Sequence, residues 1–304
     1  MTTLDTPATP TQTVPAVQVD GLTLQRGRWK TVLHDIHLQV PEGAVLGLVG
    51  RNGAGKSSLI ECLVGLTVPD TGHCRLLGEP ATNLSDDVRN RLGYVAQAPD
   101  LFAWLSGSEH LRRFGQAYRD FDAKRALHLA VQWGLNMAKA AGQLSGGDQQ
   151  KLSVVLALAH DPDLLILDEP VASLDPLTRR DFMRTLFERR WQTQAPRTVV
   201  ISSHLLSDLE RVVTHVAFMR EGEIQLMDEW DALTEHLRLL ERPVGDSALP
   251  RQALHRRQVE GHMRVLFDAR TAGAPPGAGR ALTLDELFVE LNAPDSSGPA
   301  QRGG

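Results

Sequence analysis

A glycine-rich segment near the start of the chain carries the residue types needed to hold a phosphate group. It reads Gly50-Arg51-Asn52-Gly53-Ala54-Gly55-Lys56-Ser57. Glycines let the backbone curl so that several N–H groups point at one anion, and a helix start adds unpaired donors and a positive dipole end. Lys56 can reach the terminal phosphates of a nucleotide, and the Ser57 hydroxyl can ligate Mg²⁺. The segment therefore predicts a nucleotide-binding loop.

The residues on either side of this loop supply the elements that such a loop requires. Residues 44–49 form an apolar run that predicts a buried strand, and residues 57–64 predict a helix that includes Ser58. Strand, glycine loop and helix in this order is the context in which the motif binds nucleotide.

A second group of candidate residues follows other predicted strands. Asp168 and Glu169 come directly after the apolar run 164–167. A carboxylate at this strand end can share the Mg²⁺ with Ser57, and Glu169 can orient a water as a general base. Gln97 ends its own short strand, 93–96, and could contact both the metal and the water. Taken alone, Asp168 could instead cap a helix and Glu169 could be a solvated surface carboxylate.

The amino-acid composition limits the classes of protein to which the chain could belong. The chain has 304 residues, a formal net charge of -5 and 42% hydrophobic residues, which are ordinary values for a soluble globular protein. Only Cys62 and Cys74 are present, so we expect no disulfide framework and a reducing compartment. No run approaches the roughly 20 apolar residues of a membrane span. Residues 1–16 and 293–304 are expected to be disordered tails.

Strands and helices are expected to alternate along the first part of the chain, with a helical insertion. Strands are predicted at 17–24, 34–40, 44–49, 73–77, 93–96, 164–167, 198–201, 213–219 and 223–227, and helices at 57–64, 85–91, 149–159 and 177–191. Within the insertion, helices are expected at 108–119 and 121–133, with apolar residues spaced three and four apart: Leu111, Phe114 and Tyr118, then Leu127, Ala130 and Val131. Beyond about residue 228 we expect a helix at 230–240, a strand at 263–267 and a last helix at 283–291.

Six segments in this order resemble the ATP-binding cassette (ABC) ATPases over roughly residues 17–227. Residues 50–57 are similar to the family's Walker A loop, and Gln97 to its Q-loop. The other four are the signature Leu144-Ser145-Gly146-Gly147, the Walker B segment 164–169, the D-loop Ser173-Leu174-Asp175, and the switch histidine His204. The signature, placed upstream of Walker B and followed by His204, is what singles out this family among nucleotide-binding proteins.

The resemblance implies an α/β fold: a P-loop NTPase (RecA-like) core with an antiparallel β subdomain and a helical subdomain at about residues 98–148. Residues 17–228 would form this ATPase domain, and residues 229–292 a small accessory region. The cofactors implied are ATP and Mg²⁺, the metal being held by Ser57, Gln97 and Asp168. Ser58 and the Walker A backbone would contact the phosphates, with Lys56, Glu169, Gln97 and His204 as the catalytic residues.

The resemblance also implies a head-to-tail dimer that holds two ATP molecules between its chains. Ser145, Gly146 and Gly147 of one chain would cap the γ-phosphate held by Lys56 of the other, and Asp175 would link the two sites. ATP would close the dimer and hydrolysis would open it.

Two positions depart from the family pattern. Asp148 replaces the usual Gln after the signature; its carboxylate could weaken closure or accept from a ribose hydroxyl, and neutral variation is the interpretation we favour. The usual adenine-stacking aromatic is missing near Arg26. Trp29 could substitute for it, or the Arg26 guanidinium could stack, although Trp29 could also simply pack.

With one cassette and no membrane span, the chain is predicted to be the nucleotide-binding subunit of a transporter, at the inner face of the cell membrane. Its partners would be a second ATPase chain and an integral membrane subunit, with no nucleic acid. Leu101, Phe102, Trp104 and Leu105 could line the groove for that subunit or pack within the helical insertion. Residues 282–288 resemble bacterial export ATPases. The alternative is a soluble ABC ATPase acting in DNA repair, translation or cofactor assembly.

Overall fold

A computed structural model describes most of the chain. The described residues are 14–27, 30–171, 174, 176–187, 195–203, 209–245, 250, 252–271 and 278–293, without the side chains of 176 and 177. In this part of the chain, no helix is long and apolar enough to span a membrane.

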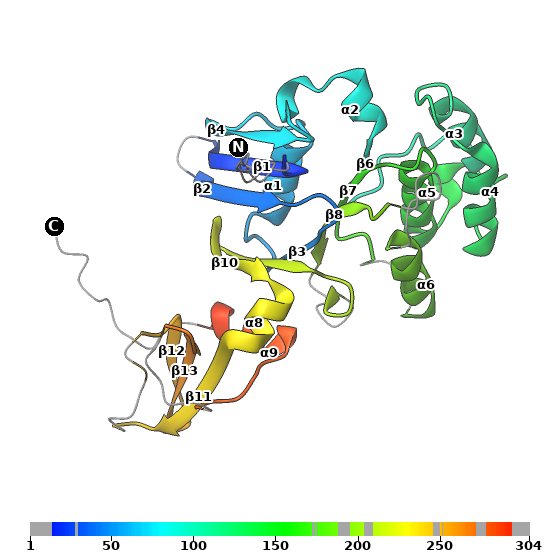
Figure 1. The fold of residues 1–304 in the computed structure, drawn as a ribbon. Coiled ribbons are helices and arrows are strands. Elements are labelled where there is room, and N and C mark those ends of the chain that lie inside the picture. The colour runs from blue at the N-terminus through cyan, green and yellow to red at the C-terminus, as the bar shows by residue number, and fades with distance from the viewer. Residues whose placement is uncertain are drawn as a thin grey trace, which may run out of the picture.

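The centre of the molecule is a six-stranded sheet with the order β10-β9-β3-β8-β7-β6 (Figure 1). Its strands are β3 (Val45–Gly50), β6 (Leu92–Val95), β7 (Leu164–Asp168), β8 (Thr198–Ser203), β9 (His215–Arg220) and β10 (Glu223–Glu229). All neighbours pair in parallel except β9 and β10, which form an antiparallel hairpin. The parallel pairing brings the carboxyl ends of β3, β8, β7 and β6 to one edge, where the candidate site residues follow.

A second, antiparallel sheet packs against this centre, as predicted. It has the order β2-β1-β4-β5. Its strands are β1 (Val17–Arg26), β2 (Lys30–Val40), β4 (Thr71–Leu76) and β5 (Glu79–Pro80), and it is accompanied by α1 (Lys56–Leu63), η1 (Ala81–Asn83) and α2 (Asp86–Asn90). The side chain of Ser85 caps α2 by accepting from the backbone of Val88.

The helical insertion contains α3 (Gly107–Phe114), α4 (Ala123–Gln132), η2 (Ala141–Gln143) and the start of α5 (Gly146–Leu158). The prediction for residues 115–119 was wrong: α3 ends at Phe114, where Gly115 approaches the ring of Phe121 closely enough that a Cβ would lie 3.0 Å from it.

Of the three apolar residues named for α4, Ala130 is buried, whereas Leu127 and Val131 are 47% and 67% exposed. Ala126 and Leu129 are buried in their place. Both sets of apolar residues have helical spacing, so periodicity could not decide which of them meets α5.

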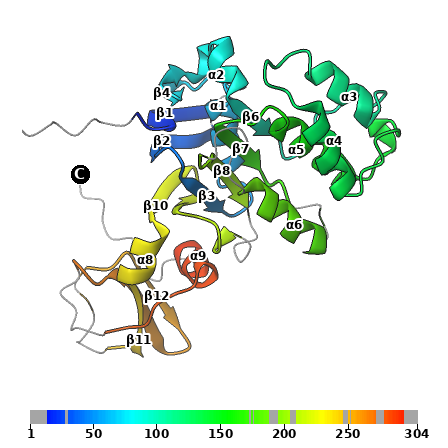
Figure 2. The same cartoon turned by 45° about the vertical axis from the view of Figure 1, so that its right-hand side comes forward.

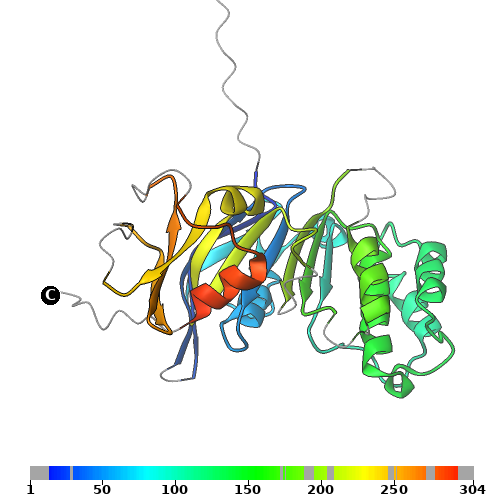
Figure 3. The same cartoon turned by 90° about the horizontal axis from the view of Figure 1, so that it is seen from below.

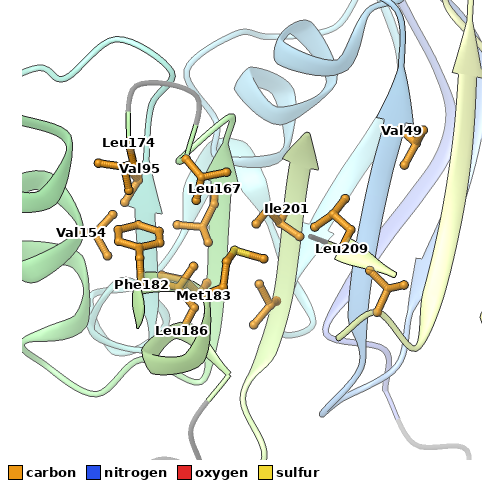
Figure 4. Close-up of a cluster of buried hydrophobic side chains, with 14 of the residues drawn as sticks. Val49, Val95, Val154, Leu167, Leu174, Phe182, Met183, Leu186, Ile201 and Leu209 are labelled. Atoms are coloured by element: carbon orange, nitrogen blue, oxygen red, sulfur yellow. The ribbon is translucent and has the colours of Figure 1, made fainter. Parts of the chain in front are cut away.

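The two sides of the central sheet enclose separate hydrophobic clusters. Along β7, Leu164 and Ile166 face α1 and the antiparallel sheet, whereas Leu165 and Leu167 face the helices of the other side. Because both faces of the strand are buried, residues 164–167 are all apolar, although neighbouring side chains point to opposite faces. Figure 4 shows the side with Leu165 and Leu167, where Phe182, Met183 and Leu186 of α6 (Pro176–Leu186) pack against the sheet.

The C-terminal region differs most from expectation. The predicted helix at 230–240 is wrong beyond residue 236, because α8 (Trp230–His236) gives way to β11 (Leu237–Pro243). This strand pairs with β13 (His262–Asp268), which pairs with β12 (His255–Val259), a polar strand that was not predicted. Sheet pairing overrides the helical periodicity of residues 237–240. The last helix, α9 (Leu284–Asn292), was predicted correctly.

The accessory strands and the helical subdomain lie at opposite ends of the molecule (Figures 1 and 2). Helix α9 lies between the accessory strands and the central sheet, as Figure 3 shows from below. Its Leu284, Leu287 and Leu291 are buried in the same cluster as Val49 and Phe218 of the central sheet.

Candidate nucleotide-binding and catalytic site

The glycine-rich loop links the end of β3 to the start of α1. Gly53 and Gly55 have φ values of 83° and 105°, a conformation that side chains with a Cβ rarely adopt. Gly50 lies so close to β9 that a Cβ there would be 2.6 Å from the carbonyl oxygen of Met219. The backbone of Ala54 accepts a hydrogen bond of 3.0 Å from Gly222 in the β9–β10 turn. The loop is therefore built by glycine geometry and held by the neighbouring hairpin.

Lys56 joins this loop to the end of β7. Its Nζ donates to the carbonyl oxygen of Gly50 at 2.7 Å and lies 3.6 Å from Oε1 of Glu169. Both side chains are 6% exposed. An ion pair with this little exposure is screened by solvent much less than a surface pair.

Ser202 contacts both Asp168 and Glu169 at the end of β7. It lies opposite Asp168 in the β7–β8 register. Its Oγ donates to Oδ1 of Asp168 at 2.5 Å and accepts from the backbone N–H of Glu169 at 2.8 Å. Glu169 has a φ of 46°, which is unfavourable for a residue with a side chain and is typical of functional positions. The sequence analysis missed Ser202; its place at the end of the strand next to β7 was the available signal.

The other predicted metal ligands lie at the same edge. Ser57 stands in the first turn of α1, as does Ser58, which was predicted to contact the phosphates; Gln97 is exposed two residues beyond the end of β6, which pairs with β7. Ser57, Gln97 and Asp168 offer hydroxyl, amide and carboxylate oxygens, the ligands that Mg²⁺ prefers. The donor set therefore fits a magnesium ion.

The signature residues lie in the helical subdomain, at the start of α5. Ser145 is the N-cap and accepts from the backbone N–H of Asp148 at 3.1 Å. Ser145 and Gly146 are exposed, and Gly147 is half-buried. No hydrogen bond or ion pair within the described ranges joins them to the glycine-rich loop. They present an exposed helix start, which suits an anion brought by another molecule.

A cavity of about 410 Å³ opens on the outer side of the glycine-rich loop. It is lined by residues 51–54, by Arg220 and Glu221 of the β9–β10 turn, and by Asn292 at the end of α9. The sequence analysis assigned no role to Arg220, Glu221 or Asn292, because nothing local connects them to the loop.

Comparison with known proteins settles the family. Residues 33–172 match a family model described as "ABC transporter". The chain is 33% identical, over 211 residues, to the bacitracin transport ATP-binding protein BcrA of Bacillus licheniformis, and the alignment covers 68% of each chain. The chain belongs to the ABC transporter family. It is a nucleotide-binding subunit of this family and hydrolyses ATP.

Two further similarities agree with this assignment. The Nod factor export ATP-binding protein I of Burkholderia lata is 35% identical over 203 residues, which span 64% of this chain and 64% of that relative. A solved structure of the ATP binding subunit of an ABC transporter superposes with a TM-score of 0.65 at 27% identity, covering 72% of this chain and 92% of that chain. The predicted α/β, P-loop NTPase fold is confirmed.

The two departures from the family pattern, at Asp148 and Arg26, each have a partner of opposite charge. Asp148 Oδ1 lies 3.2 Å from Nζ of Lys151, one turn further along α5, and Lys151 also donates to the carbonyl oxygen of Trp133. Arg26 pairs with Glu61 of α1, so its guanidinium is held beside the helix that follows the Walker A loop. The predicted site residues Trp29, Asp175 and His204, and the D-loop residue Ser173, lie outside the described residues.

Proposed function

We propose that this chain is the ATPase subunit of an export-type transporter and drives a separate membrane subunit by closing and opening a head-to-tail dimer. The observation that carries the proposal is the buried contact between Lys56 of Walker A and Glu169 of Walker B, 3.6 Å apart at the edge where the parallel strands end. The cofactors are ATP and Mg²⁺, with Ser57, Asp168 and Gln97 holding the metal.

Nucleotide binding changes the partners of Lys56. Its ammonium group moves from the carbonyl of Gly50 and the carboxylate of Glu169 to the β- and γ-phosphates. Glu169 then accepts from a water and orients it toward the γ-phosphate, while Ser202 keeps the backbone of Glu169 and the carboxylate of Asp168 in place. The metal, when bound, neutralises charge that develops on the phosphate oxygens.

A second chain completes the site. The exposed start of α5, with Ser145, Gly146 and Gly147, supplies N–H donors to the γ-phosphate held by the facing chain. From their place in the sequence motifs, His204 would act as the switch histidine and Asp175 as the D-loop aspartate. Near the base, the Arg26 guanidinium, oriented by Glu61, offers a flat cationic surface in place of an aromatic ring.

The membrane subunit docks between the core and the helical subdomain. Two adjoining cavities of about 430 and 770 Å³ share Arg89, Phe114 and Tyr118 in their walls. Of the four residues predicted to line this groove, Leu101 lines the first cavity and Phe102 the second, Trp104 is 73% exposed, and Leu105 is buried. Leu105 thus packs within the insertion, and the other three are available to a partner.

Export is favoured over import by the relatives. The similar proteins from Bacillus licheniformis and Burkholderia lata are named for bacitracin transport and Nod factor export. The segment 282–288, which contains the first turn of α9, resembles the C-terminal end of ATPases that serve bacterial export systems with separate membrane subunits.

The decisive experiment replaces Glu169 by Gln, which removes the base and the negative charge but keeps the side chain's size. With ATP and Mg²⁺ the variant, alone or with its native partner, should form a stable dimer in size-exclusion chromatography coupled to light scattering. The double variant that also carries Lys56→Ala is the control and should stay monomeric. A Glu169→Gln protein that binds ATP but never associates would rule out the dimer mechanism.

Fractionation of cells separates the transporter from the soluble alternative. We expect the native protein in the membrane fraction, released with a membrane subunit by mild detergent. Copurification with ribosomes or DNA, and none with membranes, would instead support the soluble ABC ATPase.

A further inference from the structure

Both ends of helix α9 are hydrogen-bonded to the ATPase domain, and its C-terminal end lies beside the Walker A loop. At its start, the backbone N–H of Leu284 donates to Oε1 of Glu210 at 3.4 Å. At its end, Nη1 of Arg220 donates to the carbonyl oxygen of Leu291 at 3.4 Å. A cation at this position satisfies a free carbonyl and complements the negative end of the helix dipole.

The end of α9 also forms one wall of the cavity beside Walker A. Asn292 lines this cavity opposite residues 51–54. Its Nδ2 donates to the carbonyl oxygen of Phe288, whereas its Oδ1 is buried without a hydrogen-bond partner among the described residues. A buried acceptor of this kind costs free energy until it finds a donor. A small shift of the loop or of α9 that brought a donor to Oδ1 of Asn292 would lower the free energy of the folded protein.

The other side of α9 is tied to the accessory sheet. Glu290, whose side chain is 4% exposed, accepts two hydrogen bonds of 2.7 Å from Arg257 of β12, and one oxygen lies 3.5 Å from Arg264 of β13. A bidentate pair fixes direction as well as distance. The accessory sheet cannot move relative to α9 without breaking this pair.

We propose that the accessory region positions the Walker A loop through the end of α9, with Arg220 and Asn292 as positioning residues. The proposal rests on the proposed nucleotide binding at Lys56 and adds a mechanical link from that site to β12 and β13. Because coupling between two sites is reciprocal, nucleotide must change the surroundings of Asn292, and loosening Glu290 must change nucleotide affinity.

The first test reads the surroundings of position 292 directly. Cys62 and Cys74 are both buried, so a thiol reagent will report mainly on an introduced cysteine. We expect ADP with Mg²⁺ to change the labelling rate of Asn292→Cys at least threefold. The matched control, Val244→Cys at the far end of the accessory sheet, should change less than 1.5-fold.

The second test weakens the pair at Glu290. Glu290→Gln should raise the Kd for ADP at least threefold. Asp161→Asn is the control, because Asp161 forms a similarly buried pair with Arg197 (2.9 Å) that does not involve α9; its Kd should stay within twofold. Both are measured at a temperature where thermal unfolding shows each variant fully folded.

The outcomes separate the two proposals. If ADP binds the wild type, yet labelling at 292 is unchanged or both buried-pair variants alter the Kd equally, the link through α9 is refuted. If ADP does not bind the wild type at all, the nucleotide site itself is wrong.

Discussion

At the scale of single residues, the structure explains how this chain accommodates an acid at the signature. Asp148 stands in the first turn of α5, where its charge is favourable for the helix dipole. Lys151, 14% exposed, pairs with it. Much of the negative charge is therefore neutralised within the chain before a nucleotide approaches.

We expect Asp148→Gln to change the ATPase rate, or ATP-driven dimer formation, less than tenfold. The reason is that Lys151 keeps its second contact, with the carbonyl of Trp133, in the variant. Steady-state phosphate release over a range of ATP concentrations is the measurement. A larger loss would mean that the carboxylate itself contacts the nucleotide.

The two cysteines should be inert in the folded protein. Burial raises the pKa of Cys62 to about 11 and that of Cys74 to about 12, so the reactive thiolate is scarce at neutral pH. We expect no reaction with a chromogenic disulfide reagent within an hour at pH 8, and stoichiometric reaction of both thiols in denaturant. Rapid labelling of the native protein would contradict the packing around α1 and β4.

At the scale of elements, the start of α9 is secured by a reciprocal cap. The side chain of Thr283 accepts from the backbone of Glu286, and Glu286 accepts from the backbone of Thr283 and pairs with Arg280. Hydrogen bonds to its charged form, first from Arg280, lower the pKa of Glu286 to about 2. The cap therefore depends on an ionised carboxylate.

This cap makes a defined contribution to the pH dependence of stability. Because the pKa of Glu286 is lower in the folded state, its contribution is complete above the ordinary value of 4.5 and disappears as the pH falls toward about 2. Glu286→Gln should lower the melting temperature at pH 7, and the difference from the wild type should shrink between pH 5 and pH 3. Scanning calorimetry across this range measures it; a constant difference would count against the cap.

At the scale of the whole molecule, the groove between core and helical subdomain has the exposed Phe102 in its wall, next to the exposed Trp104. Phe102 and Trp104 are 50% and 73% exposed, and their ring centroids lie 5.3 Å apart. Soluble surfaces rarely gather large apolar side chains without a partner. This exposed pair is therefore the part of the groove that we expect a membrane subunit to cover.

Replacing Phe102 and Trp104 by Ser should reduce copurification with the membrane subunit at least fivefold, because the apolar contact area is lost. ATP hydrolysis by the isolated chain should stay within twofold. Val131→Ser, at an exposed apolar residue of α4 outside the groove, is the control and should leave copurification unchanged. If the wild type, the Phe102/Trp104 double variant and the Val131→Ser control copurify equally with the membrane subunit, the membrane contact lies elsewhere.

The sequence by itself determined what depends on neighbours in the chain. The glycine spacing of residues 50–57, the apolar run before Asp168 and the helical pattern of residues 283–291 each encode their geometry locally. These patterns sufficed for the family and the central strands.

Only the tertiary structure decided which distant segments meet. Lys56 reaches Glu169, and Ser202 reaches Asp168, because parallel strands end at one edge of the sheet. Residues 237–243 became a strand because β13 offered a pairing edge. Asn292 came to the Walker A cavity because α9 buries its leucines against the central sheet. Such contacts are set by the fit of surfaces far apart in the chain, which no local pattern records.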